Sequence, residues 1–561
     1  MLMVITGGRI LDPATGIDRI ADLWIKDNRI IDSGSLVDTG AADRILHADG
    51  CVVMAGGIDI HTHIGGGKLS LARMLLNDDD SIVVPPVEAA IDNPVERFLP
   101  TVTQTAGRYL DMGYTTCFEP AVIPCNARAS HAEMSQLDGL TTGGYCLLGN
   151  DDVLMRLIAA DSPQSLINDY VAWMVAATRC IAVKVVNPGG INAFKFGVRE
   201  MDVDTPHPHY GVTPGQIIRT LCRAVHEIGL VHPLHVHCSN LGVPGNIRST
   251  LATIAAADGL PIHLTHAQFH CYGDDGAYGM SSAATRLVDA MNRHPNVTID
   301  VGQIMFGQTV TISADSMHQY ENRRHAKPRK TALVDIECEA GCGVVPFRYR
   351  RKQFVHSLQW AIGLELFLMI DDPSRVFLTT DHPNGAPFTT YPHLLRLLGD
   401  RSFRETALAE IQVDAAASSQ LGGIDRQYSL NDIAIMTRQG PARILGLSDR
   451  GHLAVGAVAD IAVYQIDSNL ETMFSRPLHV ISGGRLVRSG GVALDPPISK
   501  PELHPALVAD VRYDADSVKQ FQRMYRDNGT FAMNRLAISD CEWNESLRCQ
   551  DIATKLRERS R

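Results

Sequence analysis

The chain has 561 residues, of which 45% are hydrophobic and 20% are charged, as in a soluble globular protein with room for a large barrel and accessory parts. Its formal net charge of −11 gives no broad basic field for phosphate groups, so general nucleic-acid binding is not expected. No apolar run approaches the ~20 residues of a membrane span, and we expect neither a membrane segment nor a signal peptide.

The twelve cysteines are scattered along the chain, which is typical of a reduced, cytoplasmic protein and not of a disulfide framework. Cys338 and Cys342 are the tightest pair, but without a second pair or a histidine at finger spacing they indicate a zinc ribbon only weakly. Basic residues cluster at positions 323–330 and 348–352. Such runs are usually solvated loops, and a patch for an anionic cofactor tail or a partner subunit is the alternative.

Short β-like runs separated by turns fill residues 3–54. A similar pattern returns late in the chain, where residues 451–464 and 479–487 have the pattern of strands joined by turns. We therefore predict that residues 1–55 and 446–495 form one β-sandwich from both chain ends, with a long insert between them. The remaining tail, residues 496–561, is predicted to be helical.

The insert, residues 56–445, alternates apolar strands with helical stretches. Helices are expected at 213–228 and 283–293, and strands at 113–118, 180–186, 233–238, 261–266, 297–301 and 376–381. Alternation over this length predicts an α/β fold with a (β/α)8 barrel. In such a barrel the working residues lie at the C-terminal ends of the strands.

Ahead of these strands, an apolar run at residues 51–55, predicted to be a buried strand, leads to a His-x-His motif. The apolar run is followed by Gly56 and Gly57, and an apolar/polar alternation then leads to His61 and His63. Because residues i and i+2 of a strand point to the same face, the two imidazoles can be aimed at one point. Neutral imidazole is a common metal ligand. The alternative is two histidines at a polar strand end.

The predicted strand 180–186 contains a lysine among apolar residues. Lys184 lies within the apolar run 182–186, and a lysine is rarely buried without a partner. Burial lowers the pKa of a lysine, and a neutral amine can react with carbon dioxide to give a carbamate that bridges two metals. Lys195 is the rival candidate, but it follows a glycine-containing turn and is less strand-like.

Histidines also end the two following strands. His235 and His237 alternate on one strand, and the residue at the strand end is the better ligand, so His237 is preferred. By the same reasoning His266 is preferred over His263. His270, which follows one turn later, is a candidate for contact with the substrate.

Asp381 ends an apolar run and starts a turn, so it could simply cap a helix or form an Asx-turn. As a metal ligand it would also take a proton from a metal-bound water and give it to a leaving nitrogen. Two metals that share a hydroxide would hold this nucleophile against a polarised carbonyl. The predicted chemistry is hydrolysis of an amide-like bond or its reverse.

These residues carry a resemblance to the metal-dependent amidohydrolases. The segment 56–63, the Gly-x-Thr-Thr strand at 113–116 and the β-domain turn at 456–461 are similar to motifs of that superfamily. The resemblance implies a binuclear site, with zinc as the expected metal. The ligands that it implies are His61, His63, carboxylated Lys184, His237, His266 and Asp381, the last of which also shuttles the proton.

Longer motifs at 185–190, 234–246, 265–273 and 378–388 resemble the amidohydrolase-type subunit of formylmethanofuran dehydrogenase and its counterpart in the bacterial formyltransferase/hydrolase complex. This resemblance extends to about residue 495 and favours the bacterial complex. It implies reversible hydrolysis of an N-formyl furfurylamine cofactor of the methanofuran type to formate and free amine, with further subunits as partners. Within these motifs, Asn187, Asn240 and His382 are expected to bind the cofactor.

Two other functions are compatible with part of this pattern. A free-standing cyclic-amide hydrolase, such as a dihydroorotase or hydantoinase, would use the same metals. The motifs that begin at Asn187 and Asp381 argue against it. A metal-free barrel that serves only as a structural subunit is the second alternative. The complete ligand set argues against that, because such a protein is expected to lose ligands.

Overall fold

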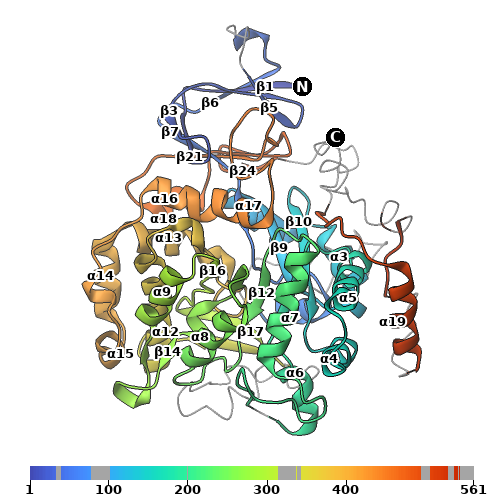
Figure 1. Cartoon of the computed structure of the whole chain (residues 1–561). Helices are drawn as coiled ribbons and strands as arrows, with labels where there is room; N and C mark the ends of the chain where they lie inside the picture. The colour runs from blue at the N-terminus through green and yellow to red at the C-terminus, as the bar shows by residue number, and fades with distance from the viewer. Residues whose placement is uncertain are drawn as a thin grey trace, which may run out of the picture.

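The computed structural model describes residues 1–32, 39–76, 102–198, 200–313, 336–337, 343–494, 506–527, 536–540 and 543. The basic cluster at 323–330, the pair Cys338 and Cys342, and most of the C-terminal tail lie outside these residues. A β-rich part, built from both ends of the chain, stands above a larger α/β part (Figure 1).

The larger part is an eight-stranded parallel sheet in which the strands follow one another in sequence order. Its strands are β8 (Gly57–Asp59), β9 (Tyr114–Val122), β10 (Thr141–Leu148), β11 (Ala182–Val186), β12 (Leu234–His237), β13 (Ile262–Leu264), β16 (Val297–Asp300) and β20 (Val376–Phe377). Beyond the ends of the first and last strands, Thr62 forms a parallel bridge with His382. The amide of His63 also donates to the His382 carbonyl over 2.9 Å. These contacts close the ring, and the predicted (β/α)8 barrel is confirmed.

A helix follows each strand of the ring. These helices are α2 (Val102–Asp111), α3 (Ala127–Met134), α5 (Gln164–Ala177), α7 (Pro214–Glu227), α8 (Ile247–Ala256), α9 (Ala284–Arg293), α12 (Phe354–Met369) and α13 (Tyr391–Gly399). The start of α7 shows why they form where they do. Thr213 and Gln216 make a capping box, and Pro214 occupies the first turn, where no backbone donor is needed. The buried face of α7 carries Ile217 and Leu221.

Two sheets make up the β-rich part. One has the order β24-β23-β22-β21-β7-β2-β3, and the other has the order β5-β4-β1-β6. At the centre of the first, β7 (Cys51–Ala55) pairs antiparallel with β21 (Ile461–Gln465), so the two ends of the chain share one sheet. Their inward-facing side chains form one apolar core, which includes Met3, Ile25, Val53 and Val463. The remaining strands of these sheets are β24 (Val492–Ala493), β23 (Arg485–Ser489), β22 (His479–Ser482), β2 (Arg9–Asp12), β3 (Ile17–Ile20), β5 (Arg29–Ile31), β4 (Leu23–Lys26), β1 (Leu2–Thr6) and β6 (Arg44–His47).

The central strand β7 leads straight into β8, the barrel strand that precedes His61 and His63. Two glycines make this passage possible. A Cβ atom on Gly56 would lie 2.2 Å from the Thr115 hydroxyl, and one on Gly57 would lie 2.7 Å from the Tyr114 ring. The close approach of β8 to β9 therefore requires glycine at both positions.

Two additions flank the barrel. The strands β17 (Gly307–Ser313), β18 (Ile336–Glu337) and β19 (Gly343–Tyr349) form a small sheet that packs on α1 (Gly67–Leu75) through Val310, Val344 and Ala72. This sheet was not predicted from the sequence. In the C-terminal tail, α19 (Ala515–Asp527) lies beside α4 (Asp152–Ala159) and α5 (Figure 1). Its buried Phe521 stacks on Trp173 with ring centroids 5.8 Å apart.

Candidate active site

Three groups of side chains at the C-terminal ends of the barrel strands could each hold a metal ion. Two of them are His61, His63 and Asp381, and His237, His266 and His270. The third, His61, His235 and Asp300, shares His61 with the first, and the two groups considered below are the first two. Within each group the ligand atoms lie within 4.8 Å of one another. The rings of His61 and His266, one from each group, have centroids 5.6 Å apart, so the two groups are adjacent.

The first group joins the first strand of the barrel to the last. His61 Nε2 lies 2.9 Å from Asp381 Oδ1, and His63 Nε2 lies 3.3 Å from the same oxygen. Asp381 Oδ1 nevertheless has no hydrogen bond of acceptable geometry among the described residues. Two ring nitrogens thus converge on one carboxylate oxygen. This arrangement fits a divalent cation.

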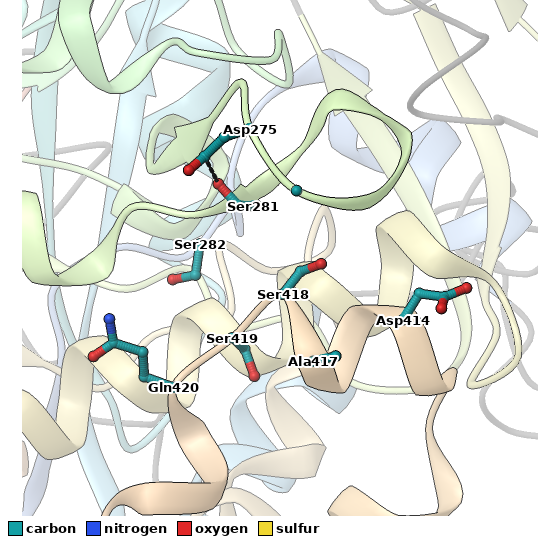
Figure 2. Close-up of a pocket in the computed structure, with 9 residues that line it drawn as sticks. Asp275, Ser281, Ser282, Asp414, Ala417, Ser418, Ser419 and Gln420 are labelled. Atoms are coloured by element: carbon teal, nitrogen blue, oxygen red, sulfur yellow. Dashed lines mark hydrogen bonds between the residues drawn. The ribbon is translucent and has the colours of Figure 1, made fainter.

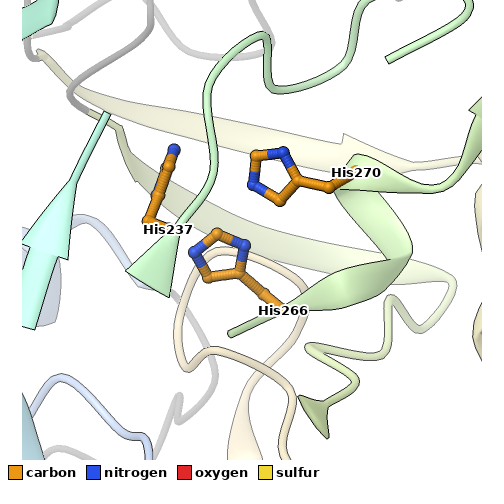
Figure 3. A group of neighbouring side chains, drawn as sticks. All are labelled: His237, His266 and His270. Atoms are coloured by element: carbon orange, nitrogen blue, oxygen red, sulfur yellow. The ribbon is translucent and has the colours of Figure 1, made fainter. Parts of the chain in front are cut away.

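The second group is shown in Figure 3, where the three imidazoles gather from β12, the turn after β13 and the following short helix. The exposed fractions of His237, His266 and His270 are 6%, 2% and 1%. Burial holds the pKa of His266 well below its ordinary value, so this imidazole is neutral and has a lone pair to offer. Its Nδ1 has no hydrogen-bond partner in the described part of the chain. This donor set also fits a divalent cation.

Lys184, on β11, lies beside the first group. Its side chain is 2% exposed, and Nζ lies 3.4 Å from His61 Nε2. Burial lowers the pKa of Lys184 to about 8, although the carboxylates of Asp381, Asp300 and Glu119 act in the opposite direction. A substantial share of the amine is therefore neutral near physiological pH, as carbamate formation requires. The rival Lys195 lies in a short helical turn, and its side chain is outside the described residues.

Glu119 on β9 is a site residue that was not predicted from the sequence. Its Oε1 lies 3.1 Å from His63 Nδ1, and its Oε2 accepts the amides of Ile64 and Gly65 over 2.7 and 3.0 Å. Burial would lower the pKa of His63, but Glu119 and Asp381 outweigh it and raise this pKa to about 9. With Nδ1 facing Glu119, His63 is turned so that Nε2 points toward Asp381. The sequence feature that could have identified Glu119 is its position as a carboxylate inside an apolar barrel strand.

Asp300, at the end of β16, is a second site residue that was not predicted from the sequence. It is fully buried, and its Oδ1 accepts the His266 amide over 2.8 Å and the Thr379 hydroxyl over 2.7 Å. Its Oδ2 lies 3.0 Å from His263 Nε2 and 3.4 Å from His61 Nδ1. Asp300 thus contacts one residue of each group, His61 in the first and His266 in the second. The sequence feature that could have identified Asp300 is its position at the end of a predicted strand.

His235 and His263, which the sequence analysis did not choose as ligands, also belong to the network of buried side chains around the site. His235 Nε2 lies 2.9 Å from His61 Nδ1, and His235 Nδ1 lies 3.0 Å from His232 Nε2. His61 Nδ1 faces His235 and Asp300, and the other ring nitrogen, Nε2, therefore points to Asp381 and Lys184. His235 therefore contacts the candidate ligand His61 directly, and His263 contacts it through Asp300.

The three residues expected to bind the cofactor lie in loops after β11, β12 and β20. The backbone amide of Asn187 donates to the His237 carbonyl over 3.0 Å. The side-chain amide of Asn240 donates to Ser249 of α8 over 2.9 Å. His382 Nδ1 accepts the Phe388 amide over 3.3 Å, and burial lowers the pKa of His382 to about 3. The structure thus places all three at the rim that carries the metal groups, with Asn240 and His382 engaged in internal hydrogen bonds.

A separate groove of about 420 Å³ lies elsewhere on the barrel (Figure 2). It is formed by the hairpin of β14 (Tyr272–Gly273) and β15 (Ser281–Ser282) together with α15 (Val413–Ala417) and the residues after it. Its lining residues are Asp275, Gly276, Ser281, Ser282, Asp414, Ala417, Ser418, Ser419 and Gln420. None of these is a predicted site residue, and the set contains no histidine, cysteine or lysine. The metal groups are therefore the stronger candidate for a catalytic site.

Among the described residues, no helix combines the length and apolar character that a membrane crossing needs. The eight cysteines in this part of the chain, seven of them buried, are all free thiols.

A model of the amidohydrolase family matches residues 44–488. The FhcA component of the formyltransferase/hydrolase complex Fhc of Methylorubrum extorquens is 42% identical over 551 residues, which are 97% of this chain and 98% of that protein. Protein FwdA of Methanocaldococcus jannaschii is 35% identical over 511 residues, 88% of each chain. Among solved structures, the formyltransferase/hydrolase complex FhcABCD from Methylorubrum extorquens, in complex with methylofuran, matches with a TM-score of 0.87 and 41% identity, over 98% of this chain and 99% of that one.

Glu119→Gln is expected to weaken divalent-metal binding by about 10- to 100-fold, because the carboxylate that orients His63 is replaced by an amide whose NH2 group meets backbone donors. Zinc titration against a competing chelator measures this. Glu471→Gln is the matched control, since Glu471 pairs with His393 over 3.1 Å at a surface site. Equal zinc affinity in the two variants would show that Glu119 does not support the site.

Proposed function

The chain belongs to the amidohydrolase family, and from this premise we propose that it is the hydrolytic subunit of a formyltransferase/hydrolase complex. In this role it cleaves the N-formyl group of a furfurylamine-type cofactor to formate and the free amine. The 42% identity to FhcA over 97% of the chain is the observation that carries the proposal. With metal ions bound, the two adjacent groups of candidate ligands would supply the chemistry that cleavage of a formamide needs.

The proposed ligand set divides between two divalent ions, with zinc as the expected metal. His61, His63 and Asp381 would hold one ion, and His237 and His266 would hold the other. Carboxylated Lys184 would bridge them. When bound, the ions would supply a water nucleophile at neutral pH and polarise the formyl carbonyl.

Asp381 is the proposed proton shuttle. Burial would raise the pKa of this carboxyl, but His266 and His61 outweigh it and hold the pKa well below its ordinary value, so the group is ionised. Asn384 Nδ2 donates to Asp381 Oδ2 over 3.1 Å and fixes the plane of the carboxylate. Asp381 takes a proton from the attacking water as the new C–O bond forms. It then gives that proton to the amine nitrogen as the C–N bond breaks, which releases the free amine and formic acid. The formic acid loses its proton to solvent and leaves as formate.

Lys184 is proposed to react with carbon dioxide through its neutral amine. A bond forms between Nζ and the carbon of carbon dioxide, one proton is released, and the product is an anionic carbamate. The lowered pKa of about 8 supports this reaction. The adjacent imidazoles and any bound cations would then stabilise the negative charge, which a buried site otherwise disfavours.

Asn187, Asn240 and His382 are proposed to contact the cofactor. They follow strands β11, β12 and β20, and this places them at the rim of the barrel where ligands of this fold bind. The solved structure with a TM-score of 0.87 contains methylofuran, which supports a furan cofactor for this chain.

Location in the cytoplasm remains a prediction from the cysteine content.

Metal removal is expected to abolish formate release from an N-formyl furfurylamine, and two equivalents of zinc should restore it. In the metal-loaded protein, Asp381→Asn is expected to lower kcat by about 10²- to 10⁴-fold, because the proton acceptor is lost. Formate is measured with a coupled dehydrogenase assay. Cleavage of cyclic imides, with no formate release from the formamide, would instead identify a cyclic-amide hydrolase.

Lys184→Ala is expected to bind less metal than the natural protein, because the bridging carbamate cannot form. In the natural protein, 13C-labelled bicarbonate should give a carbamate carbon signal that is missing in the variant. Lys195→Ala is the comparison. If Lys184→Ala keeps its metal and the label while Lys195→Ala loses both, the bridge belongs to Lys195.

The proposed partners are the other subunits of such a complex. Natively expressed protein is therefore expected to elute in size-exclusion chromatography as a complex larger than its own 61.1 kDa, together with further polypeptides. A fully active, isolated monomer would contradict this part of the proposal.

A further inference from the structure

We propose that His270 is a third imidazole ligand at the second metal position, which would then hold its ion through His237, His266 and His270. The inference rests on the binuclear function proposed above and deepens it. It replaces the substrate contact that the sequence suggested for His270 with a role in metal binding.

The geometry of the three rings is the first argument. Their ligand atoms lie within 4.8 Å of one another, and the ring centroids are 4.5 Å apart for His237 and His266, 5.0 Å for His237 and His270, and 5.3 Å for His266 and His270. The three side chains surround a common space (Figure 3). Three histidines around one open position are a ligand set that zinc accepts in catalytic sites.

The local chain conformation explains why His270 joins the other two. His266 and His270 are four residues apart at the two ends of a single helical turn, the short helix Ala267–His270. The helix is of the 3-10 type, in which the spacing of four residues does not by itself align two side chains, yet the two rings stack with centroids 5.3 Å apart. His266 itself has a left-handed backbone with φ of 36°, and its amide is held by Asp300 over 2.8 Å. This uncommon conformation turns the chain so that both rings face His237.

The backbone around His270 is also fixed from the other side, by helix α8. Thr250 Oγ1 donates to the His270 carbonyl over 2.7 Å. Asn246 Nδ2 donates to the Phe269 carbonyl over 2.8 Å, and Asn246 Oδ1 accepts the Tyr272 amide over 2.9 Å. Both anchoring side chains are buried. A ligand whose backbone is held on both sides is positioned in advance for coordination, and a mobile substrate contact would not need this support.

Metal stoichiometry of four proteins tests the proposal. The natural protein is expected to bind two equivalents of zinc. His270→Ala should lose one of them, or bind it at least about tenfold more weakly. His270→Asp restores a ligand atom and should recover most of the second equivalent. His131→Ala is the control, because His131 is a buried histidine on α3 outside the site, and it should keep both.

A spectroscopic measurement separates coordination from a mere structural effect. With cobalt(II) in place of zinc, the visible spectrum of the His270 variants should change in intensity, because the number of ligands changes. Two equivalents of zinc and an unchanged cobalt spectrum in His270→Ala would overturn the inference and return His270 to a substrate contact. Absence of metal from the natural protein would instead overturn the proposed function itself.

Discussion

The closure of the barrel is the constraint on which the site depends. The first and last strands meet where Thr62 pairs with His382 and the His63 amide donates to the His382 carbonyl. Only through this contact do the histidines after β8 reach Asp381 after β20, at the opposite end of the barrel sequence. A closed parallel ring has all its strand ends on one rim. The remaining proposed ligands on β11, β12 and after β13 then follow on that rim in chain order.

The site gathers charges that a protein interior normally excludes. Glu119, Asp300 and Asp381 are all buried close to Lys184 and the histidine layer. Each carboxylate accepts hydrogen bonds or faces imidazole nitrogens, which offsets part of the cost of removing it from water. An apolar barrel centre would be more stable. The polar layer is therefore best explained by metal binding, as a cation would balance the excess of acceptors.

Strand periodicity and strand ends were sufficient to predict the barrel and to bring the candidate ligands to one rim. The alternation that ends in His61 and His63, and the lysine inside an apolar run, are local patterns whose meaning does not depend on distant contacts. Glu119 and Asp300 were missed because their role lies in contacts with other strands, which sequence spacing does not reveal. The small sheet of β17 to β19 was missed because its strands pair across a long intervening segment.

The central claim is that two divalent ions lie side by side at this rim. Anomalous X-ray diffraction from crystals of the natively purified protein, recorded on both sides of the zinc absorption edge, tests it most directly. The account predicts two adjacent peaks, one among His61, His63 and Asp381 and the other beside His237 and His266. A single peak, no peak, or peaks only in the separate serine-lined groove would contradict it.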